Sequence, residues 1–179
     1  MPLHRSLSSA ALGTRWRSYR RVPNTRLPHR WREWLLDPGS LTQRLTEASG
    51  GHFRVELRFQ GWGKPSRSEA RSLGIDPRQQ AMIREVCLLG YDQAWVYARS
   101  IIPATTLNGP LRKLRHLGNR SLGTLLFKDP GMYRGPIETT TLRVPGLCEP
   151  AHARRSVFYL NRKPLLVCEV FLPSLLRVQ

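Results

Sequence analysis

The feature that most constrains the fold of this chain is an apolar hairpin over residues 154–173, close to the C-terminus. Its second arm, residues 165–172, contains seven apolar residues and one carboxylate, Glu169. Side chains alternate between the two faces of a strand, and here both faces are apolar. This pattern is typical of a strand buried on both sides. The hairpin therefore predicts two antiparallel strands, the second of them buried on both sides.

Glu169 is the first candidate functional residue. An ionised carboxylate in an apolar strand is costly unless it is paired, hydrogen-bonded or kept for a ligand. Residue type alone leaves two interpretations open, because this acid could face a ligand or form a structural ion pair with one of the many arginines.

Two more apolar runs, residues 81–89 and 93–102, contain buried charge of the opposite sign. They are separated by Gly-Tyr-Asp, which predicts a second hairpin. In the first run Arg84 shares a face with apolar residues only, and in the second Arg99 does the same. Arg84 is thus a candidate binding residue, while Arg99 is either a further candidate or an arginine that extends to the sheet edge.

The remaining pattern predicts short helices and a few more strands. Strands are predicted at residues 53–59 and 133–144, which makes six in all. Apolar spacing and caps predict helices at 28–37, 41–48 and 106–117 and a short capped segment at 120–127, with loops at 61–77 and 145–153. Since the strands beside short turns must be antiparallel, the fold class is α+β, with helices covering a six-stranded antiparallel sheet.

Composition gives weaker guidance. Lys and Arg number 29 against 12 Asp and Glu, a net charge of +17 that favours anionic partners, either nucleic acid or small anions. The arginines are scattered, however, which favours genomic base composition as the origin of this bias. Trp62 beside Lys64 could contact nucleic acid, but a turn with one Trp is the simpler interpretation. Three cysteines without metal-ligand spacing and five isolated histidines predict no metal site.

Residues 1–27 are predicted to be a basic N-terminal extension ahead of a single domain at 28–179. The first 32 residues contain eight Arg and no acid, which is similar to a mitochondrial transit peptide or to an ordinary basic N-terminus. We expect no secretory signal, and the sequence contains no apolar run of membrane-spanning length. About 30 residues are also too few for a winged-helix DNA-binding unit.

In its order of motifs the chain resembles the bacterial chorismate pyruvate-lyase family, the enzymes that open ubiquinone synthesis. The resemblance covers roughly residues 28 to 173, and no single motif is strong. The matching motifs are Ser40-Leu-Thr-Gln-Arg44, Arg84-Glu85, Ala98-Arg-Ser-Ile-Ile-Pro103, Thr106-Leu-Asn-Gly-Pro110, Leu117-Gly118, Ser121-Leu-Gly123, Leu126-Phe127, Arg134, Ile137-Glu138, Arg154-Arg-Ser156 and Lys163-Pro-Leu-Leu166 through Glu169 to Phe171-Leu-Pro173.

The resemblance implies a highly curved six-stranded antiparallel sheet with helices on one side and a closed internal site behind helical flaps. It also implies the reaction of chorismate to 4-hydroxybenzoate and pyruvate, without metal or organic cofactor, in the bacterial cytoplasm. The family's binding Arg corresponds to Arg84, its acidic residue to Glu169, and its flap contacts to Leu41 and Leu122. The chain departs from the family at two places: Leu41 stands where Met is common, and His152-Ala153 stands where Trp-Gly is expected, beside the 145–153 loop.

These residues suit the implied chemistry. The planar fork of Arg84 matches a carboxylate in two-point contact. Glu169 would have a raised pKa if its site is dry and if it has no partner, and it would then handle a proton at the hydroxyl end of the substrate. The second carboxylate of chorismate has three candidate partners, Arg134, Arg155 and Arg99, each of which could instead pair with a nearby acid.

Two other functions compete with the lyase. A ligand-sensing module would bind a small aromatic acid without consuming it, and the effector domains of some bacterial transcription regulators resemble this fold. A basic nucleic-acid-binding protein would show salt-sensitive binding. We expect no obligatory nucleic-acid partner, and the sequence does not predict the oligomeric state.

Overall fold

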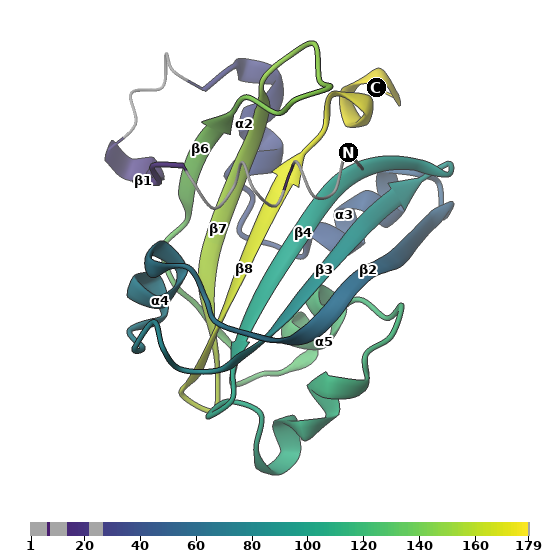
Figure 1. Ribbon diagram of the computed structural model, residues 1–179. Helices are drawn as coiled ribbons and strands as arrows, with labels where there is room; N and C mark the ends of the chain where they lie inside the picture. Colours follow the sequence, from purple (N-terminus) through teal and green to yellow (C-terminus); the bar gives the residue numbers. More distant parts are fainter. Residues whose placement is uncertain (1–6, 8–13, 22–26, 179) are drawn as a thin grey trace.

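One twisted antiparallel sheet runs through the computed structural model, which describes residues 7, 14–21 and 27–178 (Figure 1). The strands follow the order β1-β6-β7-β8-β4-β3-β2, and β5 pairs with β7. Their bounds are β1 Arg17–Ser18, β2 Phe53–Gly63, β3 Ala81–Gly90, β4 Gln93–Pro103, β5 Tyr133–Arg134, β6 Glu138–Leu142, β7 Ala151–Leu160 and β8 Lys163–Phe171. The antiparallel α+β class is therefore confirmed.

The expected count of six strands is wrong, since the described residues form eight. The single strand expected at 133–144 is divided into β5 and β6. Pro136 lies between them and has no N–H to donate to a ladder. The other additional strand, β1, pairs with β6 at the edge of the sheet, and it lies within the expected N-terminal extension. Of residues 1–27 the structure describes Leu7, residues 14–21 and Leu27, and the others lie outside the described residues.

Helices cover both faces of the sheet, which corrects the expectation of helices on one side. In Figure 1, α2, α3 and α5 lie behind the sheet and α4 lies in front of it. The apolar cluster around Leu73 of α4 includes Ile83, Ile101 and Leu166, whose side chains point away from the other helices. The bounds are α2 His29–Leu35, α3 Leu41–Ala48, α4 Arg67–Leu73 and α5 Leu122–Lys128, with 3-10 helices η1 Tyr19–Arg21, η3 Gly109–His116 and η4 Pro173–Val178.

Helix α4 lies in the segment 61–77 that was interpreted as a loop, and that interpretation is wrong. Ser66 accepts a hydrogen bond from the Glu69 N–H, and the Glu69 carboxylate accepts one from the Ser66 N–H. This capping box starts a helix even in a sequence rich in Gly, Ser and Pro. Strand β2 also extends to Gly63, so Trp62 lies on a strand rather than in a turn.

The other helix predictions are confirmed, with one change of type. Helices α2 and α3 form where expected, and Ser40 caps α3. The segment after Asn108 is a 3-10 helix, and α5 is the capped segment expected at 120–127. The loop expected at 145–153 is shorter, because β7 begins at Ala151 and pairs with both β6 and β8.

Two-residue turns fix the register of both hairpins. Asn161 and Arg162 join β7 to β8 with φ of 49° and 63°, and Tyr91 and Asp92 join β3 to β4 with φ of 48° and 61°. Positive φ at both central residues gives the turn a twist that matches the strands. Counting outward from the first turn, the ladder places Arg154 directly opposite Glu169.

None of the helices in the described ranges is long and apolar enough to cross a membrane.

Candidate active site

A cavity lies between the sheet and the helices α3 and α5. The volume open to the centres of water molecules within it is about 50 Å³. That space is enough for a few ordered waters. The sheet side and β5 contribute Val55, Arg84, Val86, Leu88, Ala98, Ser100, Arg134, Arg154, Phe158, Val167 and Glu169. The helix side contributes Gly39, Leu41, Thr42, Ser121, Leu122, Gly123, Leu126 and Phe127. The wall is thus apolar except for a few charged and hydroxyl groups.

Arg84 is a buried cation in this wall, with 2% of its surface exposed. It donates to the Gln60 side chain at 3.3 Å and to the Arg120 carbonyl at 2.9 Å. Within the described part of the chain no carboxylate pairs with it, and burial lowers its pKa. A desolvated guanidinium that holds only neutral partners is suited to bind an anion.

Glu169 lies in the same cavity, and it is paired. Arg154, which is 1% exposed, donates from Nε to Glu169 Oε2 at 2.5 Å. The structure therefore does not contain the unpaired carboxylate that one interpretation required. Glu169 thus forms the ion pair of one interpretation and also lines the cavity, while its role towards a ligand stays a prediction.

Arg134 is a second cation at the cavity. Among the described residues, no carboxylate is hydrogen-bonded to it. It donates to Ser156 Oγ at 3.1 Å and to the Pro38 carbonyl at 3.1 Å, and it lies 5.0 Å from the centroid of the Phe158 ring. Burial and then the neighbouring charge of Arg154 lower its pKa to about 10. It stays charged at neutral pH and is available to an anion.

The other two candidates for the second carboxylate lie on the opposite face of the sheet. Arg99 bonds to Glu69 at 2.8 Å and to Glu85 at 2.6 Å, and Arg155 bonds to Glu138 at 2.7 Å. Neither lines the cavity. Each follows a cavity-lining residue in its strand, and successive side chains of a strand point to opposite faces of the sheet. For these two arginines the ion-pair interpretation applies.

The helix side of the cavity includes the starts of α3 and α5, which carry Leu41 and Leu122. The two helices are joined by a hydrogen bond of 2.6 Å between Thr42 Oγ1 and Ser121 Oγ. A Cβ at Gly123 would lie 2.9 Å from Thr42 Oγ1, so this close approach depends on glycine. Ser40 and Ser121 cap the two helices and fix where they begin.

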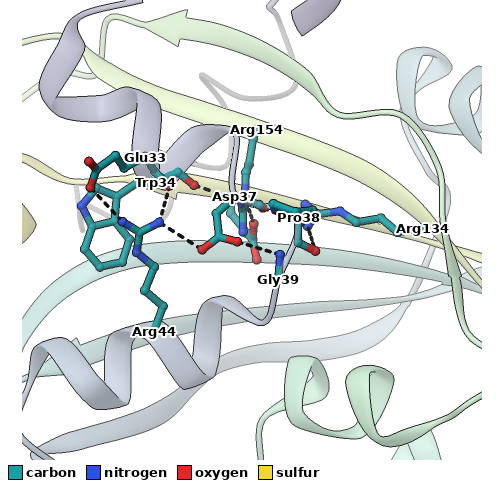
Figure 2. A network of polar contacts seen from close by, with 9 residues as sticks. Glu33, Trp34, Asp37, Pro38, Gly39, Arg44, Arg134 and Arg154 are labelled. Carbon is teal, nitrogen blue, oxygen red and sulfur yellow. Dashed lines mark hydrogen bonds and ion pairs between the residues drawn. The ribbon is translucent and has the colours of Figure 1, made fainter.

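The segment from Leu36 to Ser40, hereafter the linker, connects α2 to α3 and is held by arginines of the cavity (Figure 2). Arg154 donates to the Trp34 carbonyl at 2.9 Å and to the Asp37 carbonyl at 2.7 Å. Arg134 donates to the Asp37 carbonyl at 3.3 Å and to the Pro38 carbonyl. The helix that closes the cavity is thereby connected to the charged groups that line it.

Sequence reasoning missed Arg154 as a site residue, although a signal for it was present. With a two-residue turn at Asn161 and Arg162, strand pairing alone places Arg154 opposite Glu169. The role of the linker carbonyls had no sequence signal, because any residue supplies a carbonyl. Among the described residues no group of three His, Cys, Asp or Glu could hold a metal ion.

Solved structures share the fold at low sequence identity. The effector domain of PhnF from Mycobacterium smegmatis aligns with a TM-score of 0.55 at 16% identity, over 76% of this chain and 90% of that one. A GntR-family transcriptional regulator from Bacillus cereus aligns with a TM-score of 0.53 at 12% identity, over 69% and 93%. At this identity the likeness shows the fold alone, and it confirms the expected similarity to regulator effector domains.

Sequence relatives are much more similar. A protein of Marinobacter nauticus named a probable chorismate pyruvate-lyase is 43% identical, over 80% of this chain and 77% of the relative. A protein of Pseudomonas entomophila named probable chorismate pyruvate-lyase 2 is 41% identical, over 92% of this chain and 91% of the relative. The family model described as chorismate lyase matches residues 19–178. This chain belongs to the chorismate lyase family.

Proposed function

We propose that this protein is a chorismate lyase, which converts chorismate to 4-hydroxybenzoate and pyruvate as the first step towards ubiquinone in the bacterial cytoplasm. The observation that carries the proposal is Arg84, a buried cation with no carboxylate partner among the described residues, in a cavity that also contains Arg134 and the Arg154–Glu169 pair. Two cations without a bonded acid match the two carboxylates of chorismate.

Each cation has a role in this proposal. Arg84 holds the ring carboxylate through its planar fork, between the apolar surfaces of Val86 and Leu122. Arg134 holds the enolpyruvyl carboxylate, since it is the one member of the three earlier candidates that lines the cavity. Leu41 and Leu122 close over the ring and exclude water, which strengthens both charge contacts.

The reaction needs little from the protein beyond position and proton handling. The ether bond between the ring and the enolpyruvyl oxygen breaks, and the neighbouring ring carbon, which bears the hydroxyl, loses its hydrogen as a proton. The ring becomes aromatic, and the enolpyruvyl methylene gains a proton to give pyruvate. Glu169, held by Arg154, faces the hydroxyl end, where it accepts the hydroxyl hydrogen bond and assists the departure of the proton.

The test is to mix purified protein with chorismate in metal-free buffer that contains a chelator, and to follow both products. We expect 4-hydroxybenzoate and pyruvate in equal amounts. Arg84→Ala should weaken binding of substrate and product by roughly 2 to 5 kcal/mol, because a desolvated charge contact is lost. Glu169→Gln keeps the shape and removes proton exchange, so turnover should fall steeply. Near-normal turnover of that variant would leave Glu169 as a hydrogen-bonding residue only.

A small-aromatic-acid sensor with this fold would give a different result. It would bind 4-hydroxybenzoate saturably through Arg84 and release no product from chorismate. That outcome would contradict the lyase proposal and leave the anion-binding role of Arg84 intact.

A further inference from the structure

Arg44 joins three parts of the structure on the outer side of α3. Its guanidinium donates to the Asp37 carboxylate at 3.0 Å, to the Glu33 carboxylate at 3.2 Å and to the Glu33 carbonyl. It also lies 4.3 Å from the centroid of the Trp34 ring. Figure 2 shows this side chain extending from α3 to the end of α2 and to the linker. One side chain thus connects α3 to α2 and to the linker.

Asp37 is the centre of this arrangement. Burial alone would raise its pKa, but the Gly39 N–H, which donates to Oδ1 at 2.7 Å, and the Arg44 guanidinium lower the pKa below its ordinary value. The carboxylate therefore both turns the linker towards α3 and holds Arg44. The residue after this turn, Ser40, caps α3 at the point where Leu41 enters the cavity.

The two sides of the linker are held in different ways. On the cavity side Arg154 and Arg134 bind linker carbonyls, and both belong to the charged wall of the site. On the outer side the contact is made by Arg44, whose side chain is 26% exposed and does not line the cavity. The outer contact can open into solvent without disturbing the charges that hold a ligand.

We propose that Arg44 is a positioning residue that latches α3 in its closed position and so sets the rate at which the aromatic product leaves. This proposal rests on the proposed function for the identity of the product. The cavity is bounded by α3 and α5, so a ring-sized ligand reaches solvent by displacement of one of them. Breaking the Arg44 contacts with Asp37, Glu33 and Trp34 frees α3 and leaves Arg84 and Glu169 in place.

The experiment compares Arg44→Gln and Asp37→Asn with the wild type. Arg54→Gln is the matched control, because Arg54 also pairs with acids, but these are Glu56 of β2 and Asp92 of the β3–β4 turn rather than residues of α2 or the linker. Hydrogen exchange of the α3 amides is measured without ligand, and dissociation of 4-hydroxybenzoate is measured by stopped flow. We expect both to become roughly three- to tenfold faster in the two latch variants and unchanged in the control.

Two further measurements separate a latch from a merely structural residue. The rate of a single turnover of bound chorismate should be unchanged in Arg44→Gln, because the chemistry does not involve α3 opening. High salt should speed product dissociation in the wild type but not in Arg44→Gln, since partly exposed ion pairs are screened. Arg44→Lys keeps the charge without the fork and should restore part of the wild-type rate.

The results that overturn the latch are specific. Unchanged exchange of α3 in Arg44→Gln would show that Arg44 does not hold the helix. Faster exchange with unchanged product dissociation would show that α3 is not the gate, and slowed single turnover would place Arg44 in the chemistry. Failure of the proposed function is a separate outcome, because it appears in the wild type as absence of turnover, while the exchange measurement still tests whether Arg44 holds α3.

Discussion

At the scale of single residues, burial of the Arg84 guanidinium destabilises the ligand-free protein. A buried guanidinium loses hydration, and neither Gln60 nor the Arg120 carbonyl replaces an anion. We expect Arg84→Met to raise the free energy of unfolding by about 1 to 3 kcal/mol and to abolish binding of 4-hydroxybenzoate, because well-packed apolar side chains often stabilise a protein in place of buried charge. Urea unfolding and ligand titration of the same preparation check both parts. A destabilised variant would mean that Arg84 holds the fold together.

His152 gives a second residue-scale prediction, which concerns pH. Its side chain is 8% exposed, its Nδ1 lies 3.3 Å from Thr141 Oγ1 and its ring lies 5.6 Å from that of Trp31. Burial lowers its pKa below the ordinary value of 6.5. The unfolded chain therefore takes up a proton first, and stability falls as the pH drops below about 6.5 towards the lowered folded pKa.

The variant His152→Gln should remove this part of the pH dependence. We expect the urea midpoint of the wild type to fall more between pH 7 and pH 5 than that of the variant, since Gln keeps a hydrogen bond to Thr141 without titrating. Measurements above pH 5 keep most carboxylates ionised. Parallel pH curves for the two proteins would contradict the assignment.

At the scale of elements, the contact between α3 and α5 depends on one glycine. In Gly123→Ala the new methyl group would lie 2.9 Å from Thr42 Oγ1, so either the Thr42 hydroxyl turns away from Ser121 or the two helices separate, although Ala favours helix. We expect weaker binding of 4-hydroxybenzoate by severalfold. Adding Thr42→Ala removes the clash and should restore most of the affinity, which gives a non-additive double-mutant cycle. Additive losses would show that the two residues act independently.

The elements also show what could be predicted from the sequence. The β7–β8 hairpin, the β3–β4 hairpin and α3 were predicted correctly, because apolar alternation and a Ser cap are local signals. Helix α4 was missed because the Gly, Ser and Pro content was weighted above the Ser66–Glu69 capping box. The break between β5 and β6 was missed for a similar reason, since Pro136 carried the signal within an otherwise strand-like segment.

For the site, the sequence predicted which residues lie together in one cavity, but not which hydrogen-bond and ion-pair partners they have. Arg84, Glu169, Leu41 and Leu122 line one cavity, as the family resemblance implied, while their roles stay predictions. The pairing of Glu169 with Arg154 needed the register of the hairpin. The linker contacts could not be predicted, because they depend on how α2 packs against β7.

At the scale of the whole molecule, one face of the sheet carries the residues proposed to bind a ligand, and the opposite face carries an ion-pair cluster that stabilises the fold. Alternation along β3 directs Arg84 to the cavity and Glu85 to the opposite face, where Glu85 and Glu69 bond to Arg99 of β4. Burial alone would lower the pKa of Arg99, but its bonds to Glu69 and Glu85 raise it above its ordinary value. Arg84 and Arg99, which are buried on opposite faces of one sheet, thus have opposite electrostatic environments.

This separation predicts that Arg99→Met behaves as the inverse of Arg84→Met. Removing Arg99 withdraws the cation from two buried carboxylates, so the free energy of unfolding should fall by about 3 to 5 kcal/mol. The folded protein should still bind 4-hydroxybenzoate with wild-type affinity, because Arg99 does not line the cavity. Urea unfolding and ligand titration at low temperature, where the folded fraction is largest, measure the two effects. If Arg99→Met kept its stability and lost binding, the charge of Arg99 would have to act on the site through the sheet. The assignment of binding to one face and stability to the other would then be wrong.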